Sequence, residues 1–141
     1  MKDMAKNEIA NIIYVLAYLA KINNAVYLAE KKTFKIVCER FGIKILELRE
    51  ILKESVSLKK SLNAINSKES KKILVNLMVL MVSVDGYVCD NQKKSIVKIM
   101  DSIGESAKDH FFFDKDGGLD LKLVIENELK ILSNLPPTHP L

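Results

Sequence analysis

The sequence has few of the residues that interrupt or cross-link a chain. Its 141 residues include two cysteines, no tryptophan and five glycines. Cys38 and Cys89 are too few and too far apart for a disulfide framework or a thiolate metal site, so we expect both to be buried in a reducing compartment. All three prolines lie within positions 136–140. Proline therefore interrupts no helix before this tail.

Long apolar runs are also missing. The apolar stretches 9–20 and 73–84 are shorter than the roughly 20 residues that cross a bilayer. A composition that is 48% hydrophobic and 28% charged is that of an ordinary globular domain. We therefore expect no transmembrane segment and a cytoplasmic protein, while peripheral association with a membrane stays open.

Motifs for catalysis or cofactor binding are absent as well. The two histidines are His110 and His139, and no serine or cysteine stands in a nucleophile motif. The chain has no glycine-rich phosphate loop. A calcium loop starting at Asp114 would need glycine and glutamate where Leu119 and Ile125 stand. We expect neither an enzyme nor a bound cofactor.

An internal repeat is the strongest feature that is present. Residues 11–42 fall on residues 73–104 when the sequence is shifted by 62 positions, so that Lys31-Lys32 meets Lys93-Lys94 and Gly42 meets Gly104. Eight pairs of apolar positions also coincide: Ile12/Leu74, Ile13/Val75, Val15/Leu77, Leu16/Met78, Leu19/Met81, Phe34/Ile96, Val37/Ile99 and Phe41/Ile103. A repeat of the apolar phase predicts two similar helix-turn-helix units that share one core.

Apolar residues recur at helical spacing along the whole chain. The pattern predicts helices at about 4–22, 28–41, 43–57, 58–66, 67–84, 91–103 and 120–133. Gly42 and Gly104 are expected to follow the last residue of a helix, and Asn66 to cap the start of one. The helix at 67–84 is almost wholly apolar in its second half, so Leu77, Leu80, Met81 and Val84 should lie in the core.

These elements together predict an all-α fold. We expect a compact single-domain bundle of about six to seven helices, built from two pseudo-symmetric helix-turn-helix repeats. The domain would span residues 1–135, with repeat halves at about 4–57 and 67–133. Residues 136–141 would form an extended tail.

Residues 77–104 carry a more specific pattern. An apolar helix ends at Asp85-Gly86, Val88 follows two residues later, and an amphipathic helix then ends near Gly104. This pattern resembles that of the tellurite-resistance TerB-like family. The resemblance implies a small helical domain with two pseudo-symmetric halves. It also implies a non-catalytic module that contacts a protein partner in a stress-response or envelope-associated setting, and it predicts neither the partner's identity nor the oligomeric state.

In the TerB-like family, clustered acidic residues are proposed to bind a metal. The resemblance places such a cluster here at Asp85, Glu30 and Asp90. Gln92 stands where the family usually has glutamate, and Asn23-Asn24 replaces one Asp-Gly pair, so a divalent cation would bind weakly or not at all. A helix stop at Asp85-Gly86 and helix-dipole pairing of Glu30 and Asp90 form the favoured interpretation. A weak divalent-metal sensor is the second alternative function.

Basic residues gather in the first half of the chain. Lysine and arginine outnumber aspartate and glutamate in residues 1–72, whereas the rest is net acidic. The first alternative function is therefore a binder of nucleic acid or an anionic surface, with Lys31, Lys32, Lys35, Arg40, Lys93, Lys94 and Lys98 in one stripe. Because Arg40 and Arg49 are the only arginines, few side chains offer a bidentate fork. We do not expect nucleic-acid binding.

Three consecutive phenylalanines, Phe111–Phe113, form the last candidate. We expect part of this segment to lie in the core and part to be exposed. An exposed aromatic side chain here would indicate a surface for a partner.

Overall fold

The computed structural model describes residues 6–21, 28–44, 57–83, 90–107, 110–113 and 118–133. Within these ranges the chain forms seven helices and no strand, which confirms the all-α prediction: α1 (Lys6–Lys21), α2 (Leu28–Arg40), α4 (Leu58–Asn63), α5 (Lys68–Ser83), α6 (Asp90–Ser102), α7 (Leu121–Glu126) and α8 (Glu128–Ser133). A lone antiparallel bridge joins Phe113 to Leu119. Most of the helix predicted at 43–57, and the tail at 136–141, lie outside the described residues.

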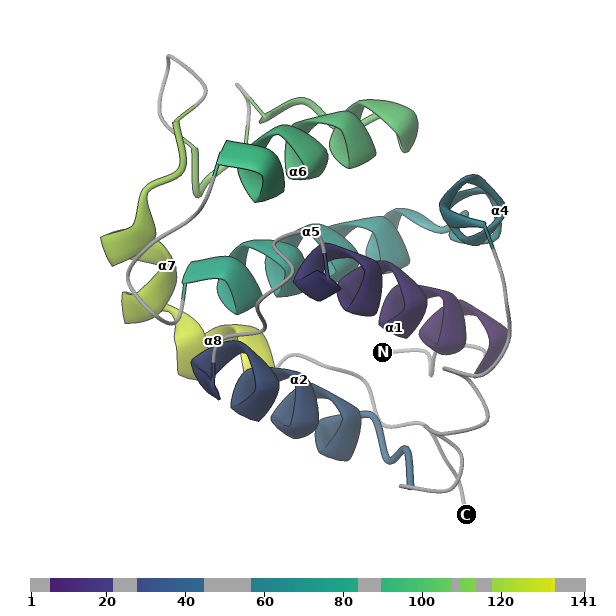
Figure 1. The fold of residues 1–141 in the computed structure, drawn as a ribbon, viewed down its shortest axis with the longest axis horizontal. Coiled ribbons are helices and arrows are strands. Elements are labelled where there is room, and N and C mark those ends of the chain that lie inside the picture. Colours follow the sequence, from purple (N-terminus) through teal and green to yellow (C-terminus); the bar gives the residue numbers. More distant parts are fainter. Residues whose placement is uncertain are drawn as a thin grey trace.

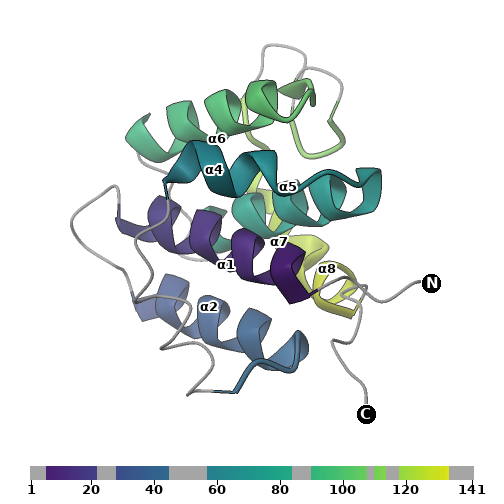
Figure 2. The ribbon, with the colours of Figure 1, turned by 90° about the vertical axis from the view of Figure 1, so that its right-hand side faces the viewer.

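Helices α1 and α5 lie side by side at the centre of the molecule (Figure 1). Helix α6 covers one side of this pair and α2 the opposite side, and a second view shows the same order (Figure 2). The short helices α4 and α7 contact α1 and α5, respectively, and α8 contacts α5 and α7. No described helix has both the length and the apolar content that crossing a membrane requires.

The core follows the predicted apolar pattern. Leu77, Leu80 and Met81 on α5 are buried, with Leu80 fully inaccessible to solvent, and Leu16 and Leu19 on α1 are buried too. These results confirm the predicted core, apart from Val84, which lies outside the described residues. Of the eight apolar pairs in the repeat, every member is buried except Phe34, which is partly buried against the same core.

Two glycines end the outer helices in the same way. Gly42 follows α2 and Gly104 follows α6, with φ angles of 75° and 79° in the left-handed region. The next residue in each case donates its backbone N–H to a carbonyl five positions earlier, from Ile43 to Cys38 and from Glu105 to Met100. This Schellman arrangement confirms that each glycine stands at the C′ position, one residue beyond the C-cap.

Two local predictions were wrong. The cap of α5 is Ser67 and not Asn66, because the Ser67 hydroxyl accepts the backbone N–H of Ser70 at 3.0 Å. The single helix predicted at 120–133 is divided into α7 and α8 at Asn127. The Asn127 side-chain amide donates to the Leu123 carbonyl at 2.8 Å. Such a local side-chain bond competes with continuation of the regular helix.

Candidate functional site

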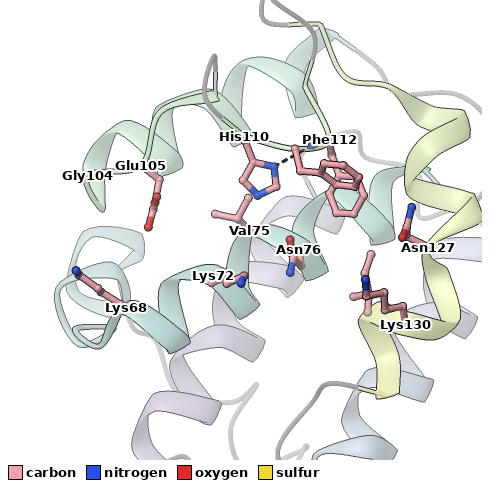
Figure 3. Close-up of a pocket in the computed structure, with 12 residues that line it drawn as sticks. Lys68, Lys72, Val75, Asn76, Gly104, Glu105, His110, Phe112, Asn127 and Lys130 are labelled. Carbon is pink, nitrogen blue, oxygen red and sulfur yellow. Dashed lines mark hydrogen bonds between the residues drawn. The ribbon is translucent and has the colours of Figure 1, made fainter.

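A cleft of about 840 Å³ lies between α5, the segment that follows α6, and α8 (Figure 3). Its apolar lining includes three buried side chains, Val75, Phe112 and Ile131. The other lining residues are more accessible: Lys68, Lys72, Asn76, Gly104, Glu105, His110, Phe111, Asn127 and Lys130. The cleft therefore has apolar parts and an open, polar rim.

The segment that follows α6 is held in place by its phenylalanines. Phe112 and Phe113 are buried, whereas Phe111 between His110 and Phe112 is 69% exposed. The backbone N–H of Asp120 donates to the Phe112 carbonyl at 2.8 Å and so fixes the segment to the start of α7. The Phe111–Phe113 prediction is confirmed, since one aromatic ring faces solvent while its neighbours belong to the core.

His110 anchors the same segment from within the cleft. Its Nδ1 accepts the backbone N–H of Phe112 at 3.2 Å, and its ring lies edge-on to that of Phe113 with the centroids 5.7 Å apart. An Nδ1 acceptor requires that the neutral ring carry its proton on Nε2. Burial lowers the pKa of His110 below its usual value; Glu105 acts in the opposite direction and Lys72 in the same one. The neutral ring is thus the form that fits this hydrogen bond.

The charge of the cleft is predominantly positive. Lys68 and Lys72 lie one turn apart on α5, and Lys130 comes from α8 on the other side (Figure 3). All three lysines are exposed, and Glu105 is the one carboxylate among the lining residues. The arrangement suits a negatively charged ligand that also carries an apolar group.

The described residues that line this cleft include no hydroxyl or thiol nucleophile. No serine, threonine or cysteine lines it. Cys38 is buried elsewhere in the core, where burial, with a lesser contribution from Glu39, raises the pKa of its thiol to about 12. A thiol with so high a pKa is inert as a nucleophile near neutral pH.

The residues predicted to hold a metal are placed only in part. Asp85, like Cys89, lies outside the described residues, and Glu30 belongs to α2 with a side chain that is not described. Asp90 is the exposed first residue of α6. Among the described residues, no three acidic, histidine or cysteine side chains converge to hold a metal ion. The cluster at Asp85, Glu30 and Asp90 therefore stays a prediction.

Gln92 has a clear place in the structure. Its side chain is 1% exposed, and its Nε2 donates to the Leu19 carbonyl at 3.4 Å. A carboxylate at this position could not donate that hydrogen bond. The amide therefore fits the interface between α1 and α6.

The lysines of the proposed basic stripe are divided between two outer helices. Lys32, Lys35 and Arg40 belong to α2, whereas Lys93, Lys94 and Lys98 belong to α6. These two helices lie on opposite sides of the α1/α5 pair (Figures 1 and 2). The predicted single stripe is thus wrong, because α1 and α5 separate its two halves.

The sequence did not single out the lysines of the cleft. Polar residues recur every four positions at Lys68, Lys72 and Asn76, which places them on one face of α5. This spacing could have indicated a shared polar surface. Lys130 lies far along the chain, and only the packing of α8 against α5 brings it to the same cleft.

No family model matches this chain, and neither a curated protein nor a solved structure matches it at a significant level.

Proposed function

We propose that this chain is a non-catalytic, TerB-like helical module that acts through contacts with another protein. The proposed setting is a cytoplasmic stress-response or envelope-associated system, as the resemblance of residues 77–104 to that family implies. The observation that carries the interaction role is the exposed ring of Phe111 beside a positively charged cleft. Large aromatic side chains on a surface are favoured anchors in protein interfaces.

The positions and contacts of the helices support the TerB-like architecture of two repeats. Helix α5 corresponds to α1, and α6 to α2, when the sequence is shifted by 62 positions. The contacts follow the same correspondence: α4 packs on α1 as α7 packs on α5, and α2 contacts α5 as α6 contacts α1. A pseudo-twofold relation between the halves would produce this set of contacts.

A second exposed apolar side chain supports the interaction role. Leu129 on α8 is 78% exposed and directly precedes Lys130, which lines the cleft. Exposing a leucine to this extent forgoes the free energy that its burial would contribute. A partner that covers Phe111 and Leu129 would recover it.

Photo-crosslinking in the cells that produce this protein can identify the partner. A photoreactive phenylalanine analogue is placed at Phe111 or Leu129, with Tyr18 on α1, which is 44% exposed, as the control position. We expect one protein to crosslink from both Phe111 and Leu129 and not from Tyr18.

The crosslinked protein is then purified and titrated by calorimetry. We expect it to bind the wild-type chain directly, with an affinity that falls about tenfold in Phe111→Ser and in Leu129→Ser. An Ile36→Ser variant on α2 serves as the matched control, since Ile36 is also exposed. Crosslinking to nucleic acid alone, or no direct binding by the purified protein, would show that the proposed function is wrong.

A further inference from the structure

We infer that the cleft between α5, residues 104–105 and 110–112, and α8 binds an extended, acidic segment of the protein partner. This inference rests on the proposed function and specifies the chemistry of the partner. The residues that line the cleft include three exposed lysines, Lys68, Lys72 and Lys130, and a single glutamate, Glu105. Charge complementarity therefore selects a ligand with several carboxylates.

The positions of the lysines fit an extended peptide. Lys68 and Lys72 are four residues apart on α5, a rise of about 6 Å along the helix axis. Alternate side chains of an extended strand are separated by nearly the same distance, about 6.6 Å. Two glutamates or aspartates at alternate positions of the segment would thus each meet one lysine on α5, while a third acid meets Lys130 on α8.

The apolar part of the cleft would take a side chain between these acids. Val75 and Ile131 are buried lining residues, and Phe111 offers an exposed ring at the rim. Burial of a leucine or phenylalanine of the segment against them would supply an attraction that salt does not screen. The inferred segment therefore alternates acidic and apolar residues.

The openness of the cleft favours a peptide over a small free anion. The three cations and Phe111 are all exposed. Pockets for small molecules instead enclose most of the ligand surface. Solvent-accessible lysines hold a single anion weakly, because water competes for each contact. A peptide that contacts several of these lysines at once binds more tightly, because one ligand makes all of the weak contacts together.

The test uses a synthetic, rhodamine-labelled nonapeptide in which glutamate alternates with leucine and phenylalanine. Its binding to the full chain is measured by fluorescence anisotropy at physiological salt. A second peptide has every glutamate replaced by glutamine. We expect the acidic peptide to bind and the neutral peptide to bind at least about tenfold more weakly, with the affinity of the acidic peptide falling as salt is raised.

Two matched variants separate a specific site from general attraction to a basic protein. The first is the triple variant Lys68→Gln, Lys72→Gln and Lys130→Gln. The second is Lys93→Gln, Lys94→Gln and Lys98→Gln, which removes the same charge from three exposed lysines on α6. We expect the first variant to lose about tenfold in affinity and the second less than about twofold. Phe111→Ser, which leaves Lys68, Lys72 and Lys130 unchanged, should also weaken binding of the acidic peptide.

Three results would overturn the inference. Equal losses in the two triple variants would show that the peptide responds only to net charge. Inorganic phosphate or citrate binding as tightly as the peptide would show that the cleft is a site for free anions. No detectable binding of the acidic peptide would exclude the inferred ligand class. In that last case, a crosslinked partner that still binds through Phe111 and Leu129 would leave the proposed function standing.

Discussion

The side-chain amide of Gln92 on α6 donates to the backbone carbonyl of Leu19 on α1, at 3.4 Å and across 73 positions of sequence. The bond is buried and joins an outer helix to the central pair. A side-chain amide that is this deeply buried is costly to leave without a hydrogen-bond partner, and the Leu19 carbonyl supplies one.

Gln92→Glu should destabilise the protein by about 1–3 kcal/mol near pH 7.5, because a buried carboxylate cannot donate to the Leu19 carbonyl. Burial should raise the pKa of the introduced acid, so the cost should shrink as the pH falls toward 5 and the carboxyl gains a proton. Urea unfolding of the variant and of the wild type at both pH values measures this loss in the free energy of unfolding. Gln92→Met is the control, since its cost should not depend on pH. An equal cost of Gln92→Glu at both values would contradict the assignment.

Leu80→Ala should reduce the free energy of unfolding by about 2–5 kcal/mol, since Leu80 on α5 is fully buried in the core. Leu129→Ala is the matched control and should change it by less than about 0.5 kcal/mol, because Leu129 is 78% exposed. Denaturant unfolding followed by circular dichroism provides the comparison. Similar losses in the two variants would show that α5 is not the centre of the core.

Gly104→Ala should cost about 1–2 kcal/mol, because Gly104 has a φ of 79° and a Cβ is disfavoured in the left-handed region. The added methyl group would meet no atom within 4 Å, so the cost comes from the backbone alone. Gly104→Asn should cost less, since asparagine tolerates this conformation better. Thermal unfolding of both variants tests whether alanine at position 104 costs more stability than asparagine. A larger loss for asparagine than for alanine would point to a steric cause instead.

The pKa of His110 should lie below the usual value of about 6.5, because burial disfavours its charged form. An NMR titration of the ring protons measures it, with His139→Asn used to assign the two signals. The unfolded chain takes up a proton below about pH 6.5 while the folded chain resists it. The stability contribution of neutral His110 is therefore present above pH 6.5 and is lost as the pH falls toward the folded pKa.

A non-titrating variant checks the consequence for stability. In His110→Asn, the side-chain oxygen can replace Nδ1 as the acceptor for the Phe112 N–H. The drop in melting temperature between pH 7.5 and pH 5 should therefore be smaller than in wild type. A titration of His110 above 6.5, or an identical drop in the variant, would show that burial does not govern this side chain.

Calcium or magnesium should raise the melting temperature very little. The predicted cluster offers three carboxylates, and binding at about millimolar affinity or weaker gives little stabilisation by RT ln(1 + [L]/Kd). Calorimetric titration and thermal unfolding with and without each cation provide the measurement. Micromolar affinity that disappears in Asp85→Ala would show that this cluster does hold a metal ion.

The sequence by itself determined the local features of this protein. Apolar periodicity predicted the buried face that contains Leu80, and glycine predicted the ends of α2 and α6 at Gly42 and Gly104. The Phe111–Phe113 run indicated a segment that is buried in one part and exposed in another. These features depend on neighbours within a few positions, because helical periodicity and capping are set by residues one turn apart.

Tertiary packing decided which distant residues meet. It brought Gln92 to Leu19, placed Lys72 and Lys130 on two sides of one cleft, and separated the lysines of α2 from those of α6. A periodic pattern identifies the face that a helix buries but not the element that covers it. The partner of a buried amide and the combined charge of a surface depend on how whole helices pack, so no local pattern in the sequence contained them.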